Sequence, residues 1–297
     1  MSGKSEWSVT EAQTLTFDRD PVRNLHVRIV NGTVNVVGTD EPNTRVEITE
    51  VEGPPLVVTH EAGHLVVAYE DLPWQGFLKW LNRKGWRRRA VVSVCVPAAA
   101  RLTVGVVGAS AVVSGMEGRA DVRGVSGHTT LVGLSGRVHA ETVSGDIEAQ
   151  SLGGELRFNS VSGNLTVIDS VVQELRADAV SGDMVVDLAP CEKPTDLRLN
   201  TVSGEVAIRL PDPIDAEVDA TTASGGISSA FAELAQHGDW GAKRLAGTLG
   251  DGAGSVHCST VSGSIALLRR PAPPDEPSDT AGPGNHPRQA AALRKDV

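Results

Sequence analysis

The chain has 297 residues, of which 40% are hydrophobic and 3% aromatic, and its formal net charge at pH 7 is −10. This composition allows a large core in one or two domains. The acidic charge argues against wholesale nucleic-acid binding, and the scarcity of aromatic rings argues against a sugar-degrading β-helix. Cys95, Cys191 and Cys258 are isolated, which indicates buried thiols in a reducing compartment. The polar start and the lack of about 18 consecutive apolar residues predict a cytoplasmic protein, with a peripheral place at the inner face of the membrane left open.

Strand signals begin near the N-terminus. We expect residues 1–13 to be disordered and one β-strand-repeat domain to span residues 14–270. The runs LTF, LHVRIVNGTVNVVG and TRVEITEV alternate apolar and polar residues, the period-two pattern of strands with one buried face. The pair Asn31-Gly32 between two such runs predicts a β-hairpin.

The next stretch, His60-Glu61-Ala62-Gly63-His64, matches the zinc-peptidase motif H-E-x-x-H. In such an enzyme His60 and His64 would bind zinc from one face of a helix, with Glu61 as the general base. However, LVV precedes the motif, LVVAY follows it and Gly63 lies inside it. We therefore expect strand, turn and strand, with EAGH as the turn, and neither a metal site nor a catalytic residue.

A basic, tryptophan-rich insertion follows at 73–89. It carries six Lys or Arg residues and no acidic residue between Trp74 and Arg89. Its apolar residues are spaced i, i+3, i+4, i+7, which predicts an amphipathic helix. This helix would either cap an open end of the fold or contact an anionic membrane or a partner, and the sequence leaves both roles open. The contact residues would be Trp74, Phe77, Lys79, Trp80, Arg83, Lys84, Trp86, Arg87, Arg88 and Arg89.

The second half of the chain repeats a Ser-Gly motif. Ser126, Ser135 and Ser144 lie nine residues apart, and later motifs follow at roughly twice that spacing or more. This spacing is too short for helix-pair repeats or propeller blades, but it suits one strand and one turn per half-coil. With the period-two alternation between motifs, it predicts a β-solenoid.

Within the motif, we expect Val143 and Ile147 to point into the coil. Gly145 between them indicates either a close approach of two sheet walls or a backbone with positive φ. Ser144 points the other way, where stacked hydroxyls can bond neighbouring coils. No histidine recurs with the motif, so we interpret the serines as structural. The polar residues that follow Ser-Gly vary too much for a calcium ladder.

Near the C-terminus an insertion at 228–247 interrupts the repeats, and we expect one short helix at Ser229–Gln236. Strand character resumes in GTLGDGAGSVHCSTVSGSIALL. Residues 271–297 are rich in proline, glycine and charge, which predicts a disordered tail.

Several of these segments resemble one bacterial family. NGTVNVVG, the strand ending in a VP step within VVSVCVPAAARLTV, and the successive TVSGDI and TVSGEV coils are similar to the β-strand-repeat family of "putative adhesins", also called the Toastrack domain. The resemblance covers most of residues 14–268. It implies a right-handed, single-sheet-stacked β-solenoid without established enzymatic activity, and an association with envelope-stress and membrane-sensing systems. It supplies no catalytic residues.

We therefore predict an all-β protein, a single-chain right-handed β-solenoid with short helical insertions, that acts as a non-enzymatic interaction or scaffold module. Its partner would be a protein or a membrane surface, without nucleic acid, cofactor or small-molecule substrate. Two alternatives remain. One is a zinc-dependent peptidase using His60, Glu61 and His64, and the other is a self-assembling bactofilin-like filament that associates through the solenoid ends.

Overall fold

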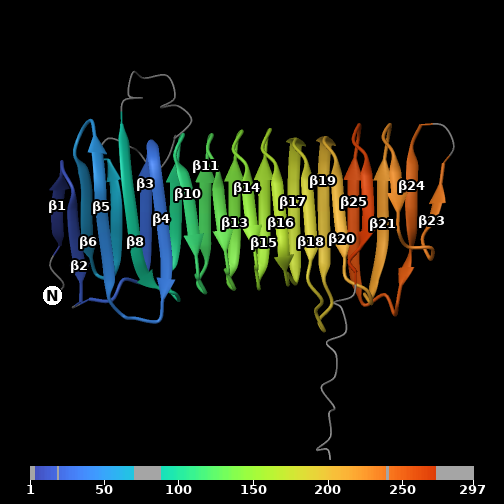
Figure 1. Cartoon of the computed structure of the whole chain (residues 1–297), viewed down its shortest axis with the longest axis horizontal. Helices are drawn as coiled ribbons and strands as arrows, with labels where there is room; N and C mark the ends of the chain where they lie inside the picture. The colour runs from blue at the N-terminus through green and yellow to red at the C-terminus, as the bar shows by residue number, and fades with distance from the viewer. Residues whose placement is uncertain (1–3, 19, 70–87, 239–240, 272–297) are drawn as a thin grey trace, which may run out of the picture.

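The structure is a computed structural model that describes residues 4–18, 20–69, 88–238 and 241–271. These residues form strands and no helix, arranged as two long sheets whose strands lie side by side along the long axis of the molecule (Figure 1). The predicted all-β, solenoid-like class is confirmed. The resemblance implied a single stacked sheet, whereas the structure has two.

We call the two sheets A and B. In spatial order, sheet A comprises β1 (Ser5–Val9), β6 (Leu56–Glu61), β7 (His64–Tyr69), β3 (Asn24–Ile29), β9 (Arg101–Val106), β11 (Ala120–Gly124), β13 (Arg137–Thr142), β15 (Glu155–Ser160), β17 (Glu174–Ser181), β19 (Asp196–Ser203), β25 (Gly254–Thr260), β21 (Ala216–Thr222), β24 (Lys243–Leu249) and β23 (Ala235–His237). Sheet B comprises β2 (Gln13–Phe17), β5 (Thr44–Glu52), β8 (Arg89–Pro97), β4 (Asn31–Thr39), β10 (Ser110–Ser114), β12 (Thr129–Val132), β14 (Ile147–Gln150), β16 (Leu165–Ser170), β18 (Met184–Leu188), β20 (Val206–Leu210), β26 (Ile265–Arg269) and β22 (Ile227–Ser229).

Consecutive strands in the middle of the chain alternate between the sheets. β13 lies in sheet A and β14 in sheet B, and each pairs in parallel with the strands of the coils before and after it. Ala120 lies opposite Val138 and Val138 opposite Leu156, so one coil here takes 18 residues (120 to 138). The nine-residue Ser-Gly spacing is half a coil, as the sequence predicted.

The core lies between the two sheets. In β13 the inward residues Val138 and Ala140 are buried, whereas the outward residues Arg137 and Glu141 remain accessible. The same alternation holds in the other central strands. Each buried Val or Leu side chain contributes about 1.5–3 kcal/mol relative to an exposed one, so a narrow interior filled with aliphatic residues needs few aromatic rings.

Stacked glycines form the corner at which the chain passes from sheet A to sheet B. A Cβ atom at Gly145 would lie 2.3 Å from the carbonyl oxygen of Gly127, and one at Gly163 would lie 2.0 Å from that of Gly145. Gly182 and Gly204 continue this column in the same way. None of these four motif glycines has a positive φ. The sequence left open a close approach of two sheet walls or a positive φ, whereas the structure shows a close approach of neighbouring coils at the same corner.

Hydroxyl groups at this corner bind the main chain. Thr142 Oγ1 accepts a hydrogen bond from Gly145 N at 2.9 Å, and Ser144 Oγ donates one to the Val125 carbonyl oxygen at 3.1 Å. The motif serine thus bonds the backbone of the preceding coil, where the sequence analysis expected hydroxyl partners. These contacts support the structural interpretation of the motif.

The predicted disordered N-terminus is wrong for the described residues 4–13. β1 pairs antiparallel with β6, and β2 pairs antiparallel with β5. Val9 is buried, and the rings of Trp7 and Phe17 meet edge to face with their centroids 5.4 Å apart. The short run WSV alternates like the later strands, and its apolar residues reach the core in the same way.

The hairpin predicted at Asn31-Gly32 is also wrong. β3 ends at Ile29 in sheet A, whereas β4 begins at Asn31 in sheet B. Ile29 and Val30 are both fully buried, so the alternation breaks where the chain turns from one sheet into the other. Gly32, with a φ of 113°, lies against the backbone of Ala90 in β8, and the glycine is needed for that contact and that φ.

The helix predicted at Ser229–Gln236 is absent. β22 ends at Ser229, Phe231 and Leu234 are buried, and β23 pairs antiparallel with β24 at the end of sheet A. An isolated helix of about two turns is only marginally stable. A strand here instead pairs with β24 and covers backbone groups that would otherwise be exposed at the sheet edge. The predicted tail lies outside the described residues, apart from Pro271 at its start.

Candidate interaction surfaces

The HEAGH stretch forms a hairpin, as predicted. β6 ends at Glu61 and β7 begins at His64, and the two strands pair antiparallel. Ala62 and Gly63 between them have φ angles of 51° and 76°. Positive φ at both central residues is the geometry of a type I′ turn.

This hairpin separates the two histidines of the motif. Glu61 lies opposite His64, and His60 lies opposite the buried Leu65, so His60 and His64 are on opposite faces of the hairpin. The His60 ring packs on Phe17 at a centroid distance of 4.9 Å, whereas His64 is exposed. The arrangement offers no shared metal site, and within the described part of the chain no three His, Cys, Asp or Glu side chains are grouped to hold a metal.

Only two of the ten residues predicted to contact a membrane or a partner are described. The Arg88 guanidinium lies 5.5 Å from the centroid of the Tyr69 ring, and its carbonyl oxygen accepts a hydrogen bond from Asn31 N. Arg89 opens β8 and forms an ion pair with Glu50 at 3.2 Å. The other eight lie outside the described residues: Trp74, Phe77, Lys79, Trp80, Arg83, Lys84, Trp86 and Arg87. No helix in the described ranges is long and apolar enough to cross a membrane.

A test of the membrane prediction should leave Arg88 and Arg89 intact, because both have contacts within the solenoid. We expect the combined changes Lys79→Ser, Arg83→Ser and Lys84→Ser to weaken binding to anionic vesicles, since each cation near such a surface contributes about 1 kcal/mol. The melting temperature should stay unchanged. Co-sedimentation with anionic and with neutral vesicles measures the effect, and a triple variant that binds like the wild type contradicts the prediction.

The outer face of sheet A is covered by ion pairs. Arg137 binds Glu155 on the next strand at 2.6 Å, and Arg123 binds Glu141 at 3.2 Å. Towards the other end, both guanidinium nitrogens Nε and Nη2 of Arg244 bind the Asp219 carboxylate. Exposed pairs of this kind contribute only about 0–1 kcal/mol each. These charged side chains nevertheless make the outer face of sheet A suitable for exposure to solvent.

The outer face of sheet B has a different character. From β4 to β26 its outward side chains are mostly small, hydroxylated or aliphatic, and they lie in register across parallel strands, except where the register between β16 and β18 shifts between Val167 and Ser170. The charged residues on these strands are Glu148, Asp169, Asp187, Arg209 and Arg269, and Asp187 binds Arg209. We call this surface the sheet B face; it consists of Thr33, Asn35, Val37, Ser110, Val112, Ser114, Thr130, Val132, Glu148, Gln150, Thr166, Ile168, Val185, Asp187, Ala207, Arg209, Ala266 and Leu268.

The large exposed hydrophobic residues of the described chain fall into two groups. On the sheet B face, Val37, Val112, Val185 and Leu268 are between 37% and 46% exposed. The other group consists of motif valines at the corner of sheet A, which the sequence analysis expected to point inward: Val161, Val180, Val202 and Val261. Val143 itself packs partly against the core. The inward orientation therefore does not extend to the later motifs.

The polar residues that follow the Ser-Gly motif form a ladder along the corner. Asp146 Oδ1 accepts hydrogen bonds from the backbone N and from Nδ2 of Asn164. Asn164 Oδ1 accepts one from Asp183 N, and Asp183 Oδ1 accepts one from Glu205 N, at 2.9 and 2.8 Å. These oxygens bond the backbone of the next coil, which supports a structural role for the ladder.

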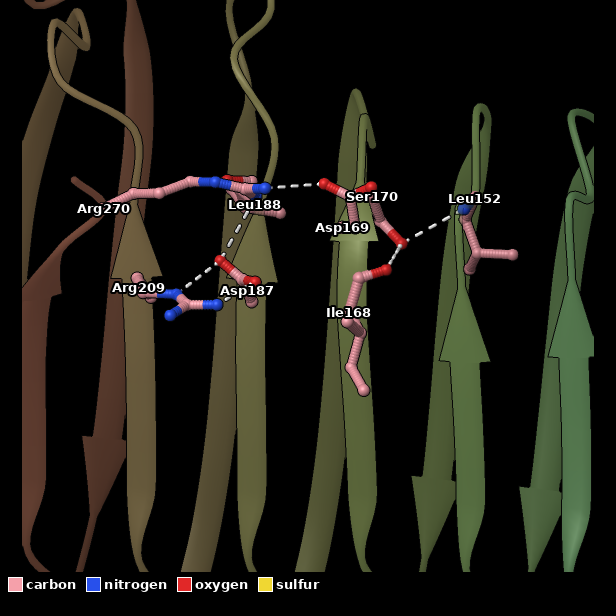
Figure 2. A network of polar contacts seen from close by, with 8 residues as sticks. All are labelled: Leu152, Ile168, Asp169, Ser170, Asp187, Leu188, Arg209 and Arg270. Carbon is pink, nitrogen blue, oxygen red and sulfur yellow. Dashed lines mark hydrogen bonds and ion pairs between the residues drawn. The ribbon is translucent and has the colours of Figure 1, made fainter. Parts of the chain in front are cut away.

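A second polar cluster lies at the margin of the sheet B face (Figure 2). The Asp187 carboxylate, on a side chain that is 7% exposed, binds the guanidinium groups of Arg209 and Arg270. Arg270 also donates hydrogen bonds to the Leu188 carbonyl oxygen at 3.0 Å and to Asp169 at 2.7 Å. Arg270, which directly follows β26, thereby binds residues of β16 and β18.

Two hollows of the described surface carry no assembled catalytic group. A groove of about 440 Å³ lies on sheet A beside Asp219 and Arg244, which already bind each other. A hollow of about 190 Å³ is bordered by loop residues that include Cys191. Cys191 and Cys95 are exposed, contrary to the expectation of buried thiols. Cys258 is buried, and burial raises the pKa of its thiol to about 12, so it is protonated and unreactive at neutral pH.

Comparison with known proteins gives one family and several solved structures. Residues 155–268 match the family model described as Toastrack DUF4097. One similar structure is a "putative cell adhesion protein" from Clostridium sporogenes, 9% identical, with a TM-score of 0.27 over 88% of this chain and 100% of that one. Another is a "putative lipid binding protein" from Parabacteroides distasonis, 13% identical, with a TM-score of 0.42 over 88% of this chain and 98% of that one. Comparison with curated proteins gives no match.

Proposed function

Because residues 155–268 of this chain belong to the Toastrack family, we propose that the protein is a non-enzymatic interaction module whose binding surface is the sheet B face. The observation that carries this proposal is the contrast between the two outer faces. Sheet A presents ion pairs such as Arg137–Glu155, whereas Val37, Val112 and Val185 on sheet B are each more than a third exposed.

The chemistry of the sheet B face favours a protein partner. Charged residues are depleted at the centres of protein–protein interfaces, because burying an unpaired charge is costly. Most side chains of the sheet B face are uncharged, and of its charged residues Asp187 and Arg209 bind each other, so a partner can cover the face while removing water from few unpaired charges.

The two alternative functions have less support. A zinc peptidase needs His60 and His64 on one face of a helix, but the hairpin puts them on opposite faces. A filament built from the solenoid ends needs long open edges. At the C-terminal end the edge strands β22 and β23 are each three residues long, and short edge strands discourage end-to-end pairing.

The test compares two valine substitutions in affinity capture from the native cell. Val112→Lys places a charge on the sheet B face, and Val161→Lys places the same charge on the corner of sheet A, where the valine is 51% exposed. We expect Val112→Lys to lose the captured partner and Val161→Lys to keep it, with both variants folded by circular dichroism. Equal capture by wild type and Val112→Lys contradicts the proposal.

A further inference from the structure

We propose that a second copy of this chain covers the sheet B face, giving a two-fold dimer in which the two solenoids pack face to face. This inference rests on the proposed function, because it names the occupant of the same surface. Four properties carry it: the area of the face, its shape, the position of the charges, and the polar groups that limit the face at both ends.

The face is large enough for a stable dimer. Eight strands, from β4 to β26, contribute to it. At about 4.8 Å between strands and about 3.3 Å per residue, a width of four to five residues gives roughly 550 Å² of projected area. A biological interface needs about 500 Å² per partner, and a standard one has about 800 Å². Protruding side chains make the accessible area larger than the projected area. The accessible area of the face therefore lies between about 500 and about 800 Å².

The shape of the face suits a flat partner. In Figure 1 the central strands lie nearly parallel to one another, across the long axis of the molecule, so the surface twists little. Thr130 lies opposite Val112 on one side and Glu148 on the other, and Val185 lies opposite Thr166 and Ala207. Two such surfaces can pack at the roughly 10 Å separation of stacked sheets. A second copy offers the same spacing of rows, as an isologous interface requires.

The charge distribution allows two acidic chains to associate in this orientation. The net charge of each chain is −10, but the ion-paired face of sheet A would point away from the partner. With layers about 10 Å apart, the two A sheets would lie about 30 Å from each other. This distance is well beyond the screening length of about 8 Å at physiological ionic strength.

Polar groups limit the sheet B face at both ends. The Arg45–Glu47 pair on β5 lies beyond β8 and β4. At the other end, Arg269 pairs with Asp212 at 2.8 Å. The usual interface has an uncharged centre and a polar rim, and the sheet B face departs from this anatomy at Glu148 on the central strand β14. Glu148 Oε2 lies 3.5 Å from His128 Nε2, and the negative charge of Glu148 opposes the dimer because it lies near the middle of the face.

The experiment is sedimentation velocity of the full chain over a range of concentrations. Val185 and Val202 are 44% and 46% exposed, but they lie on the sheet B face and on the corner of sheet A. We expect the wild type to form a dimer, Val185→Lys to raise the dissociation constant at least tenfold, and Val202→Lys to leave it unchanged. Glu148→Gln should lower it, because the variant removes a charge from the interface. This opposite effect tests the proposal even if Val185→Lys folds poorly.

Several outcomes would overturn the dimer. One is a wild type that remains monomeric at about 100 µM, where a specific dimer should be populated. Another is equal weakening by Val185→Lys and Val202→Lys. Small-angle scattering adds the geometry: face-to-face packing doubles the thickness at nearly constant length, whereas a doubled length would indicate contact through the ends. If the chain is monomeric but Val112→Lys still abolishes capture of a cellular partner, the dimer fails and the proposed function stands.

Discussion

Replacing Gly145 with alanine is expected to lower the free energy of unfolding by about 3 kcal/mol, the upper part of the range for overpacking. The new Cβ would lie 2.3 Å from the Gly127 carbonyl oxygen and 2.9 Å from Thr142 Oγ1. The carbonyl belongs to the backbone of the neighbouring coil, so relief requires the coils to separate. Urea or thermal unfolding followed by circular dichroism measures the loss, which should lower the melting temperature by roughly 6–12 °C for a domain of this size.

The matched control is Gly153→Ala, eight positions along the chain. There the Cβ would meet the Cα and Cβ of Ser135 at 3.7 Å, an ordinary contact. We expect a change within about 1 kcal/mol, because alanine also reduces the conformational freedom of the unfolded chain. Equal unfolding midpoints for the two variants would mean that the corner adjusts freely, and another explanation of the repeated motif would then be needed.

The strand period and the coil length follow from the sequence because both depend on local alternation. Runs such as LRFNS place apolar residues on one parity, and the Ser-Gly spacing sets the length of a half-coil. The HEAGH hairpin was predictable for the same reason, because strand-like runs flank a turn containing Gly63. The motif glycine could not be assigned to close approach or to positive φ, since its contact is with Gly127 of another coil.

The wrong predictions concern places where the chain changes sheet or ends one. The Asn31-Gly32 rule assumes that both flanking strands share a sheet. The signal against a hairpin was the consecutive buried pair Ile29 and Val30, which fits a corner better than a strand. The apolar spacing of Phe231 and Leu234 resembled a short helix, but a turn followed by an edge strand buries both residues as well.

The two-sided character of the solenoid was present in the sequence but was missed. Sheet A half-coils such as RVHAET, ELRFNS and DLRLNT each carry two formal charges on their outward parity, whereas in sheet B TTLV carries none and IEAQ, MVVDL and VAIRL carry one each. Comparing alternate half-coils would have separated the two faces. The size of the sheet B face could not be predicted, because it depends on how many coils stack in register.

Replacing Asp187 with asparagine is expected to cost about 1.5–3 kcal/mol at neutral pH, the range for hydrogen bonds to charged groups. Its carboxylate is 7% exposed and binds Arg209 and Arg270 (Figure 2). Asparagine keeps the shape but removes the charge that both guanidinium groups face. Arg270 also binds Asp169, so the end of the last strand should loosen without leaving the fold.

The pH dependence of this loss follows from the pKa of Asp187. The hydrogen bond from Arg209, together with the charges of Arg209 and Arg270, holds that pKa below its usual value in the folded protein. The stabilisation is therefore fully present above the unfolded pKa of about 3.9 and disappears as the pH falls through the folded pKa. The difference in unfolding free energy between wild type and Asp187→Asn should be constant near pH 7 and should shrink below about pH 4.

The control for Asp187→Asn is Asp219→Asn. Asp219 also receives two hydrogen bonds from one arginine, Arg244, but its side chain is 38% exposed and that of Arg244 is 59% exposed. Water can replace the lost partner there, so we expect a cost of about 0–1 kcal/mol. Denaturant titrations of wild type and both variants, at pH 7 and in acid, measure the unfolding free energy that each substitution costs. Equal costs, or a cost of Asp187→Asn that persists unchanged in acid, would show that burial of the Asp187 carboxylate does not strengthen its ion pairs.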